Sequence, residues 1–260
     1  MAHDRPERVR ALLTALAHDD ITVCLHVDRA SAFAVEQFVP DDHGALVVVE
    51  PRHASPWASA HSVDAITATM RAARRLDPGW FSLISGACWP TRPPAAIVER
   101  LTGSSSAGYV EARPIPPQLW ARLDQFYLSA NFPEPVERMV RRIRVRLPRR
   151  PRSRIPAPYG GSAWLDLRGD VLAWLLDRID DQPGYRRAFA FTLAPDEIYF
   201  NTLLMHSPYR DELTNIREPD ERRFGLRYMR WEGGWHPAVL SAEDLAAAGR
   251  TDCIFARKLP

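Results

Sequence analysis

The sequence has almost no lysine. Of its 34 basic residues, Lys258 alone is a lysine and the rest are arginine. The chain uses arginine wherever it serves, so this single lysine stands out, although an exposed lysine near a chain end would look the same. The formal net charge is only +2, which excludes a general electrostatic attraction to polyanions.

Cysteine and long apolar runs are also scarce. The three cysteines, Cys24, Cys88 and Cys253, form no C-x-x-C pair or His/Cys cluster that would indicate zinc. Their odd number, with Cys24 and Cys88 among apolar residues, favours buried free thiols in a reducing compartment. No run of about 18 apolar residues offers a transmembrane helix, and residues 1–5 carry no signal-peptide core. We therefore expect a soluble, cytoplasmic protein.

The first hundred residues alternate between helix and strand patterns. The chain has 260 residues, 46% of them hydrophobic and 25% charged, which suits one large or two small α/β domains. The patterns predict, in order, helix 6–18, strand 21–27, a short helix 31–38, a buried strand 45–49, helix 62–76, strand 80–84 and helix 93–101. This order predicts an open α/β sheet of the nucleotide-binding type. Ligands gather at the carboxyl ends of such strands, where Asp28 and Ser85-Gly86 stand.

The middle of the chain is rich in arginine and proline. Nine arginines fall between Arg138 and Arg154. We expect residues 133–158 to be an insertion or mobile loop in one domain spanning 1–260. Such a run is more often a solvated face than a binding site. An anionic acceptor, a lipid headgroup or nucleic acid would suit it equally, but no interleaved aromatics favour nucleic acid, and we expect at most peripheral membrane contact.

The patterns around and after this segment again predict regular structure. The expected elements are helix 119–128, helix 171–179 with Asp170 as its cap, helix 198–206 opened by Pro195-Asp196-Glu197, strand 227–231, and helix 242–248 between an N-cap at Ser241 and a stop at Gly249.

Several side chains could carry chemistry, and each also has an ordinary structural interpretation. A first-turn carboxylate such as Glu197 commonly only offsets the helix dipole, whereas a general base needs a cleft and a hydroxyl within reach. Asp28 at a strand end suits a ribose or base edge, while His26 fits a core position better than a catalytic one. Lys258 offers a compact charge for phosphate. The aromatic group of Trp231, Trp235 and His236 suits either sugar stacking or the core.

The order of these short motifs is more specific than any one of them. They are His-Val-Asp at 26–28, Ser-Gly-x-x-x-Pro at 85–90, Gly-Ser-x-Trp at 161–164, Pro-Asp-Glu at 195–197, Trp231, His236-Pro237 and Phe-Ala-Arg-Lys at 255–258. Over roughly residues 20–260, this series resembles the core-2/I-branching β-1,6-N-acetylglucosaminyltransferase family, which includes peptide O-xylosyltransferases and bacterial members.

The resemblance implies a GT-A-like α/β fold, an open mixed sheet flanked by helices. It implies an inverting, metal-independent hexosyl- or pentosyltransferase that moves a GlcNAc-like or xylose-like sugar from a UDP-sugar to a hydroxyl of a saccharide or glycosylated small molecule. No cofactor is implied beyond this donor substrate. Glu197 matches the catalytic base, and Lys258 matches a basic residue that contacts the donor diphosphate. His26, Asp28, His236 and Arg257 fall in segments that bind the nucleotide sugar, and Glu111, Ser162, Trp164 and Trp231 fall where the acceptor is contacted.

Two positions depart from the family pattern. Cys88 stands where many members have an acidic residue. The second basic residue for the diphosphate is matched locally by Trp235 or His236, which leaves His236, Arg257, Arg227 and Arg230 as candidates for that charge. Two other functions stay open. One is a non-catalytic sugar- or nucleotide-binding domain, and the other is a membrane- or nucleic-acid-associated protein acting through the run Arg138–Arg154.

Overall fold

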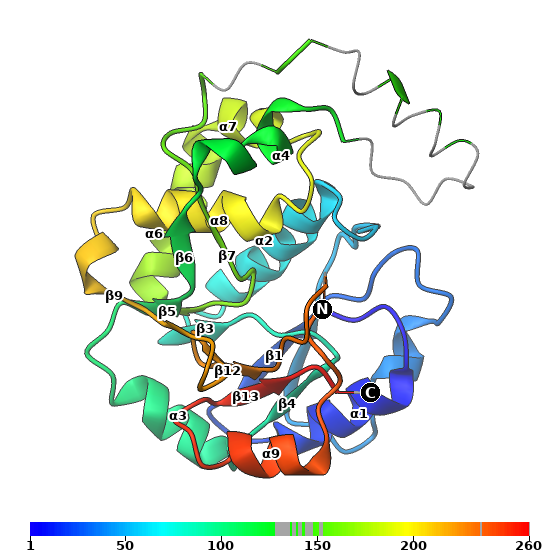
Figure 1. Cartoon of the computed structure of the whole chain (residues 1–260). Coiled ribbons are helices and arrows are strands. Elements are labelled where there is room, and N and C mark those ends of the chain that lie inside the picture. Colours follow the sequence, from blue (N-terminus) through cyan, green and yellow to red (C-terminus); the bar gives the residue numbers. More distant parts are fainter. Residues whose placement is uncertain are drawn as a thin grey trace.

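The computed structural model describes residues 1–127, 136, 139, 142–143, 148–150, 153–234 and 236–259. Strands lie in the middle of the molecule with helices on both sides (Figure 1). One side carries α2 (His61–Arg74), α6 (Gly169–Asp181) and α8 (Asp196–Met205), and the other carries α1 (Pro6–Ala15), α3 (Pro94–Thr102) and α9 (Ala242–Ala248). Within the described ranges, none of the helices has both the length and the hydropathy needed to span a bilayer.

The strands of the described residues are divided among four sheets. The four-stranded sheet has the order β3 (Trp80–Ser82), β8 (Asp166–Arg168), β5 (Gly108–Val110), β9 (Leu213–Asn215). The five-stranded sheet has the order β10 (Arg217–Glu218), β11 (Arg223–Phe224), β12 (Arg227–Met229), β13 (Phe255–Arg257), β4 (Cys88–Pro90). Two pairs remain: β1 (Thr22–Leu25) parallel to β2 (Ala45–Val48), and β6 (Ala112–Pro114) antiparallel to β7 (Tyr159–Gly161).

The main core lies between the four-stranded sheet and the helices α2, α6 and α8. Helix α6 buries Val171, Leu172, Leu175, Leu176 and Ile179 at helical spacing. Helix α8 is buried on nearly every side, from Ile198 to Leu204. Because its body is held in the core, the residues at the N-terminus of α8 have a fixed position.

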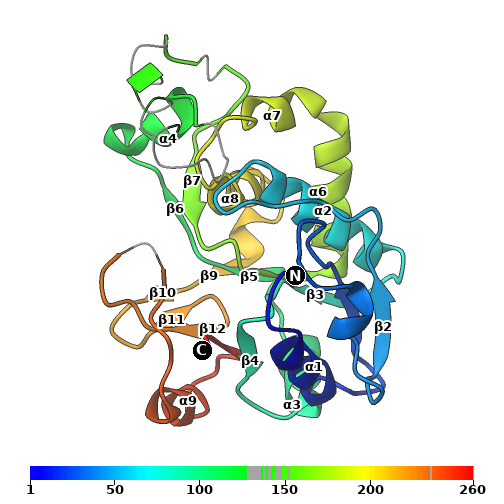
Figure 2. The same ribbon diagram turned by 90° about the vertical axis from the view of Figure 1, so that its right-hand side faces the viewer.

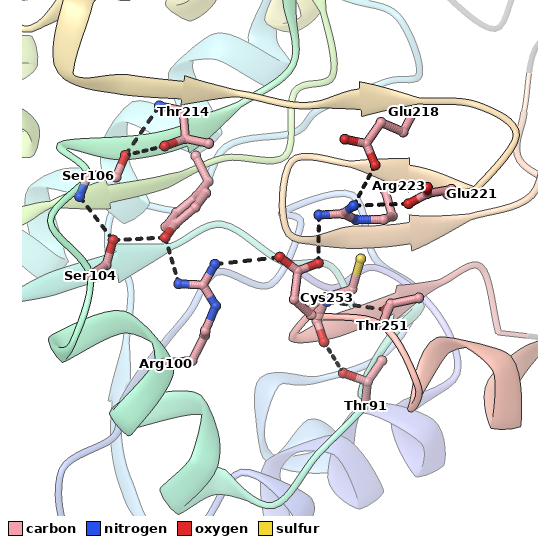
Figure 3. Close-up of polar contacts among 12 residues, drawn as sticks. Thr91, Arg100, Ser104, Ser106, Thr214, Glu218, Glu221, Arg223, Thr251 and Cys253 are labelled. Atoms are coloured by element: carbon pink, nitrogen blue, oxygen red, sulfur yellow. Dashed lines mark hydrogen bonds and ion pairs between the residues drawn. The ribbon is translucent and has the colours of Figure 1, made fainter.

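A polar network fixes the segment that leads into β13 (Figure 3). Arg223 of β11 pairs with Asp252 at 2.8 Å. Arg100 of α3 lies 3.6 Å from the same carboxylate and donates a 2.6 Å hydrogen bond to the Tyr109 hydroxyl on β5. These contacts join two sheets and a helix to the turn before β13, so they hold the C-terminal strand in place.

Most of the predicted elements are present with shifted ends. The helices expected at 6–18, 62–76, 93–101, 171–179, 198–206 and 242–248 are α1, α2, α3, α6, α8 and α9. The predicted N-cap of α9 is confirmed: the Ser241 hydroxyl accepts a 3.1 Å hydrogen bond from the Asp244 amide, and the Asp244 carboxylate accepts one from the Ser241 amide at 2.9 Å. The three cysteines are free thiols as expected, and Cys88 and Cys253 are buried, whereas Cys24 is only partly buried.

Two local predictions were wrong for structural reasons. The strand at 45–49 is not fully buried, because β1 is the only described strand with which β2 pairs, and Val48 is 38% exposed. Asp170 is not the cap of α6, which begins at Gly169 after Arg168. The Asp170 carboxylate instead accepts a 2.9 Å hydrogen bond from the Val171 amide inside the first turn.

Two predicted helices are shorter than expected. The helix at 31–38 is a single 3-10 turn, η1 (Val35–Phe38). The helix at 119–128 is replaced by η2 (Pro117–Leu119) and α4 (Ala121–Asp124), and Leu128 lies outside the described residues. Most of the segment 133–158 lies outside them too. The elements not anticipated are α7 (Pro183–Ala188), η3 (Arg210–Glu212), the strands β4 to β11 and the strand β13.

Candidate active site

Glu197 lies at the N-terminus of α8 with a cation beside it. The Arg122 guanidinium, from α4, pairs with Glu197 Oε2 at 2.7 Å. The same group donates to the carbonyls of Leu193 and Ala194 at 3.1 and 2.9 Å. The Glu197 side chain is still 45% exposed. One carboxylate oxygen is thus oriented while solvent reaches the group, which suits a carboxylate that must meet a ligand hydroxyl.

A second carboxylate, Glu111, lies near Glu197 at the junction of β5 and β6. Its side chain is buried, and burial is the largest influence on its pKa, raising it. Arg217, whose Nη1 is 3.3 Å from Oε1, and Arg113 oppose this effect, while the charge of Glu197 adds to it. The two carboxylates are therefore close enough to influence each other, as a base and a sugar-binding group at one site would be.

Asn201 ties the segments of these two carboxylates together. It lies one turn after Glu197, and its Nδ2 donates to the carbonyls of Glu197 and Ser162 at 3.1 and 3.0 Å. The Ser162 amide in turn donates to the Glu111 carbonyl at 3.2 Å. The structure thus brings together Glu111, Ser162 and Glu197, which are far apart in the sequence.

This arrangement depends on a glycine. In the pair of β6 and β7, Gly161 lies opposite Ala112. A Cβ atom on Gly161 would lie 1.8 Å from the Glu111 carbonyl oxygen, closer than any real contact. Only a residue without a side chain allows β7 to approach β6 this closely.

The residue before Glu197 is a titrating neighbour. Burial raises the pKa of Asp196 to about 6, and the Glu197 charge adds to the effect. A hydrogen bond from Ser62 and the charge of Arg122 act in the opposite direction. Asp196 Oδ1 is buried without a hydrogen-bond partner in the described part of the chain. The charge beside Glu197 therefore changes in a mildly acidic pH range.

Arg257 is the centre of a second group of side chains. Its guanidinium carbon lies 4.4 Å from the centroid of the Trp164 ring, a cation–π contact. Its Nη1 donates to the Ser85 hydroxyl and lies 4.0 Å from Cys88 Sγ. The Trp164 amide donates to Ser162 Oγ at 3.1 Å. This group is therefore continuous with the one around Glu197.

Arg227 and Arg230, two other candidates for the second basic residue that would contact the diphosphate, are paired with carboxylates of the protein. Arg227 is fully buried, with two hydrogen bonds of 2.6 and 3.0 Å to Asp166 and one of 3.0 Å to the Leu83 carbonyl. Arg230 pairs with Glu232 at 3.1 Å and Asp244 at 3.4 Å. A guanidinium buried like that of Arg227 cannot contact a diphosphate, and the guanidinium of Arg230 is already paired with two carboxylates, so Arg257 and His236 are the better candidates.

Lys258 follows Arg257 directly. Its carbonyl accepts a 2.9 Å hydrogen bond from the Leu240 amide. Its ammonium has no hydrogen-bond or ion-pair partner among the residues that the structure describes. The part of the chain that the structure describes therefore leaves this charge without a partner. Trp231 is 47% exposed and Trp235 lies outside the described residues.

His26 and Asp28 follow β1 and hold the loop at 52–55. The His26 ring is 1% exposed, stacks on His53 with centroids 6.1 Å apart, and accepts a 3.0 Å hydrogen bond from the His53 amide. Asp28 accepts from the amides of Ala30 and Ser55 at 2.7 and 2.9 Å. His26 is thus the core histidine that its sequence position favoured, and any effect on a nucleotide acts through its neighbours.

Sequence reasoning missed Trp57, which lies beside His236. The two rings are 5.3 Å apart at an interplanar angle of 63°, and Trp57 is 63% exposed. The next residue, Ala58, accepts a 2.9 Å hydrogen bond from the Ala194 amide just before α8. His236 and the start of α8 are therefore linked through this loop. Asn201 and Arg122 were missed as well. The one available signal was a polar residue, Asn201, four positions after Glu197 in an otherwise apolar helix.

Comparison with known proteins agrees with this architecture. The family model described as Core-2/I-Branching enzyme matches residues 1–248 of the chain. Among curated proteins, none matches the chain significantly. The layered helices and mixed sheets are consistent with the GT-A-like α/β fold of that family. Because the match extends over nearly the whole chain, the protein belongs to the core-2/I-branching enzymes, a family of glycosyltransferases.

Proposed function

We propose that this protein is an inverting, metal-independent glycosyltransferase. It transfers a GlcNAc-like or xylose-like sugar from a UDP-sugar to a hydroxyl of a saccharide or glycosylated small molecule. The observation that carries the proposal is the half-exposed Glu197 carboxylate, oriented by Arg122 and close to Glu111. Family membership supports the class of reaction.

Glu197 is the general base of this reaction. It takes the proton of the acceptor hydroxyl as the oxygen attacks the anomeric carbon and the bond from that carbon to UDP breaks. Attack from the face opposite the leaving group inverts the configuration at this carbon. Glu111, Ser162 and Trp164 hold the acceptor beside the base, and the exposed ring of Trp231 adds a stacking surface.

The departing UDP carries the electron pair of the broken bond. Lys258, whose ammonium is not engaged by any described residue, and Arg257 stabilise the developing charge on the diphosphate. Asp28, positioned by the loop that His26 supports, and His236 bind the rest of the donor. Since these cations do the work of a metal, transfer continues in excess EDTA, and its loss there would contradict the metal-free route.

The decisive experiment removes the base and keeps its shape. We expect Glu197→Gln to reduce the transfer rate at least about a hundredfold, while UDP affinity measured by calorimetry stays within about twofold. The matched control is Glu243→Gln, because Glu243 is also an acidic residue in the first turn of a helix, α9. The Glu243→Gln variant should lose only the interaction of this carboxylate with the helix dipole and should keep full activity. Full activity of Glu197→Gln would overturn the assignment.

A further inference from the structure

A cavity separates β1 from β3. Its volume is about 590 Å³. The residues of β1 and β3 line two of its sides, and mostly apolar side chains of α1, α2 and α3 close it above and below. None of the proposed acceptor-binding or catalytic residues lines it. It is therefore a feature distinct from the candidate active site, which it meets at Ser85, the hydrogen-bond partner of Arg257.

Met1 and Ala2 occupy one end of this gap as a β-strand would. Figures 1 and 2 both place the N-terminus at the centre of the molecule. Four hydrogen bonds hold it: Met1 N to Ile84 O at 3.0 Å, Gly86 N to Met1 O at 2.9 Å, Ala2 N to His26 O at 2.9 Å and Asp28 N to Ala2 O at 2.8 Å. Successive residues bond to opposite neighbours, and Ala2 bridges Val27 in parallel. This is the pattern of a central strand in a parallel sheet.

The strand edges on either side of the gap have unused backbone groups. Leu25 O accepts from Val49 N on the β2 side, so alternation along β1 directs the N–H and C=O groups of Thr22 and Cys24 into the gap. Leu83 N likewise donates to Leu165 O beyond the end of β3, so Trp80 and Ser82 face the gap. These four residues form no backbone hydrogen bond to any other described segment on that side.

The walls and edges together define what can fill the cavity. A hydrocarbon would leave the two rows of backbone groups without partners in a dry site, which is costly. An extended peptide satisfies both rows at once. Leu12 and Ile97 lie on one face of the gap and Ala73 on the other, so the side chains of such a peptide must be apolar on both faces, as in a central parallel strand.

We propose that this gap is the seat of an extended apolar strand of about four residues, joined to the amino group of Met1 and parallel to β1 and β3. The Met1 nitrogen donates to Ile84 O from the place where a backbone amide of such a strand would do so. As a free amine it is buried, and this burial, the largest influence, lowers its pKa to about 6. The strand joins the β2–β1 pair to the four-stranded sheet and fixes the spacing of Asp28 and Ser85.

The test adds short segments before Met1. We compare the chain carrying Val-Ile-Val-Leu in front of Met1 with chains carrying Val-Pro-Val-Leu or Ser-Gly-Ser-Gly. We expect the first to raise the Tm by at least about 5 °C over the other two and to slow amide exchange of residues 22–26 and 80–84 at least about tenfold. Proline fails because it cannot donate to the ladder. Equal Tm and equal exchange for all three chains would overturn the proposal.

Four further measurements accompany this comparison. If the extended chain folds poorly, the burial of the Met1 amine can be measured on the unextended chain. There the amine should react slowly with a modifying reagent and titrate near pH 6. Ala73→Leu narrows the gap and should cancel the gain of the apolar extension. Free acetyl-Val-Ile-Val-Leu-amide should give the unextended chain no protection. If the free peptide slowed amide exchange, the strand would not need to be joined to Met1, and the proposal would be refuted. If dodecanoate alone slowed amide exchange, the cavity would be a hydrocarbon pocket.

Discussion

Arg257 and Cys88 lie directly opposite each other in the antiparallel pair β13 and β4, with the guanidinium 4.0 Å from the thiol sulfur. Burial alone would raise the pKa of this thiol. The charge of Arg257, with help from Ser85 and Arg227, outweighs burial and lowers it. The ionisation of the Cys88 thiol therefore depends on the charge of Arg257.

The two C-terminal cations can be separated by their effect on this thiol. Arg257→Gln should weaken UDP binding about tenfold or more and raise the pKa of Cys88, because the charge that lowers it is lost. Lys258→Gln should weaken UDP binding and leave the thiol titration unchanged. Calorimetry with UDP and thiolate absorbance, in a Cys24→Ala, Cys253→Ala background, measure the two effects. If neither substitution changes UDP affinity, the diphosphate does not bind at this end of β13.

Arg122 should act on the reaction through Glu197. It holds the Glu197 carboxylate and two carbonyls of the preceding loop, so Arg122→Ala frees the proposed base to turn. We expect kcat to fall roughly tenfold to a hundredfold with UDP affinity unchanged. Arg122→Lys should restore only part of the rate, because lysine keeps the charge but lacks the planar fork.

The matched control for this prediction is Arg187→Ala. Arg187 is exposed at the end of α7, so its loss should leave kcat unchanged. A purely structural role for Arg122 predicts a different result: a lower Tm with normal kcat at a temperature where the variant is folded. That outcome would remove Arg122 from the site.

Local sequence patterns predicted much of the framework. The spacing of Val171, Leu172 and Leu175 predicted α6, and Ser241 predicted the start of α9, because periodicity and capping depend on neighbouring residues. The site was found only through motif order. Glu197 on its own looks like any first-turn acid, and its partner Arg122 is 75 positions away. Contacts over that distance are set by the tertiary fold.

The sheet was harder to predict than the helices. The sequence indicated strands at 21–27 and 80–84 in one open sheet, and the structure places the gap and Met1–Ala2 between them. Alternation of apolar residues identifies a strand but not its neighbour. Trp57 was missed for a similar reason: its proximity to His236 arises from two loops that meet in space.

Gly161 should tolerate no side chain. The added Cβ of Gly161→Ala would meet the Glu111 carbonyl at 1.8 Å, so β6 and β7 must separate. We expect a loss of about 2–4 kcal/mol in the free energy of unfolding and a loss of transfer activity, since Glu111 and Ser162 move. The control is Gly79→Ala, where a Cβ would meet nothing within 4 Å. A variant at 161 as stable and active as that control would contradict the close approach.

His26 should make stability fall in mild acid. Burial, the largest effect, together with the Met1 ammonium and His53, lowers the pKa of His26 from 6.5 to about 4, against an opposing effect of Asp28. The unfolded chain therefore binds this proton at a higher pH than the folded chain. The effect of His26 on the free energy of unfolding is absent above pH 6.5, and it grows as the pH drops from 6.5 to about 4. The total loss of stability from this one proton is about 3 kcal/mol.

Replacing the ring by an amide should flatten this pH dependence. His26→Gln keeps an acceptor for the His53 amide but cannot titrate, so its free energy of unfolding in urea should fall less between pH 6.5 and 4 than that of the wild type. The contribution of Asp196, whose pKa is raised to about 6, to the free energy of unfolding increases as the pH falls. Because Asp196 is present in both proteins, this contribution cancels in the comparison. His3→Gln, at an exposed position, should keep the wild-type slope. Equal slopes for His26→Gln and the wild type would show that His26 takes its proton as readily in the folded protein as in the unfolded chain.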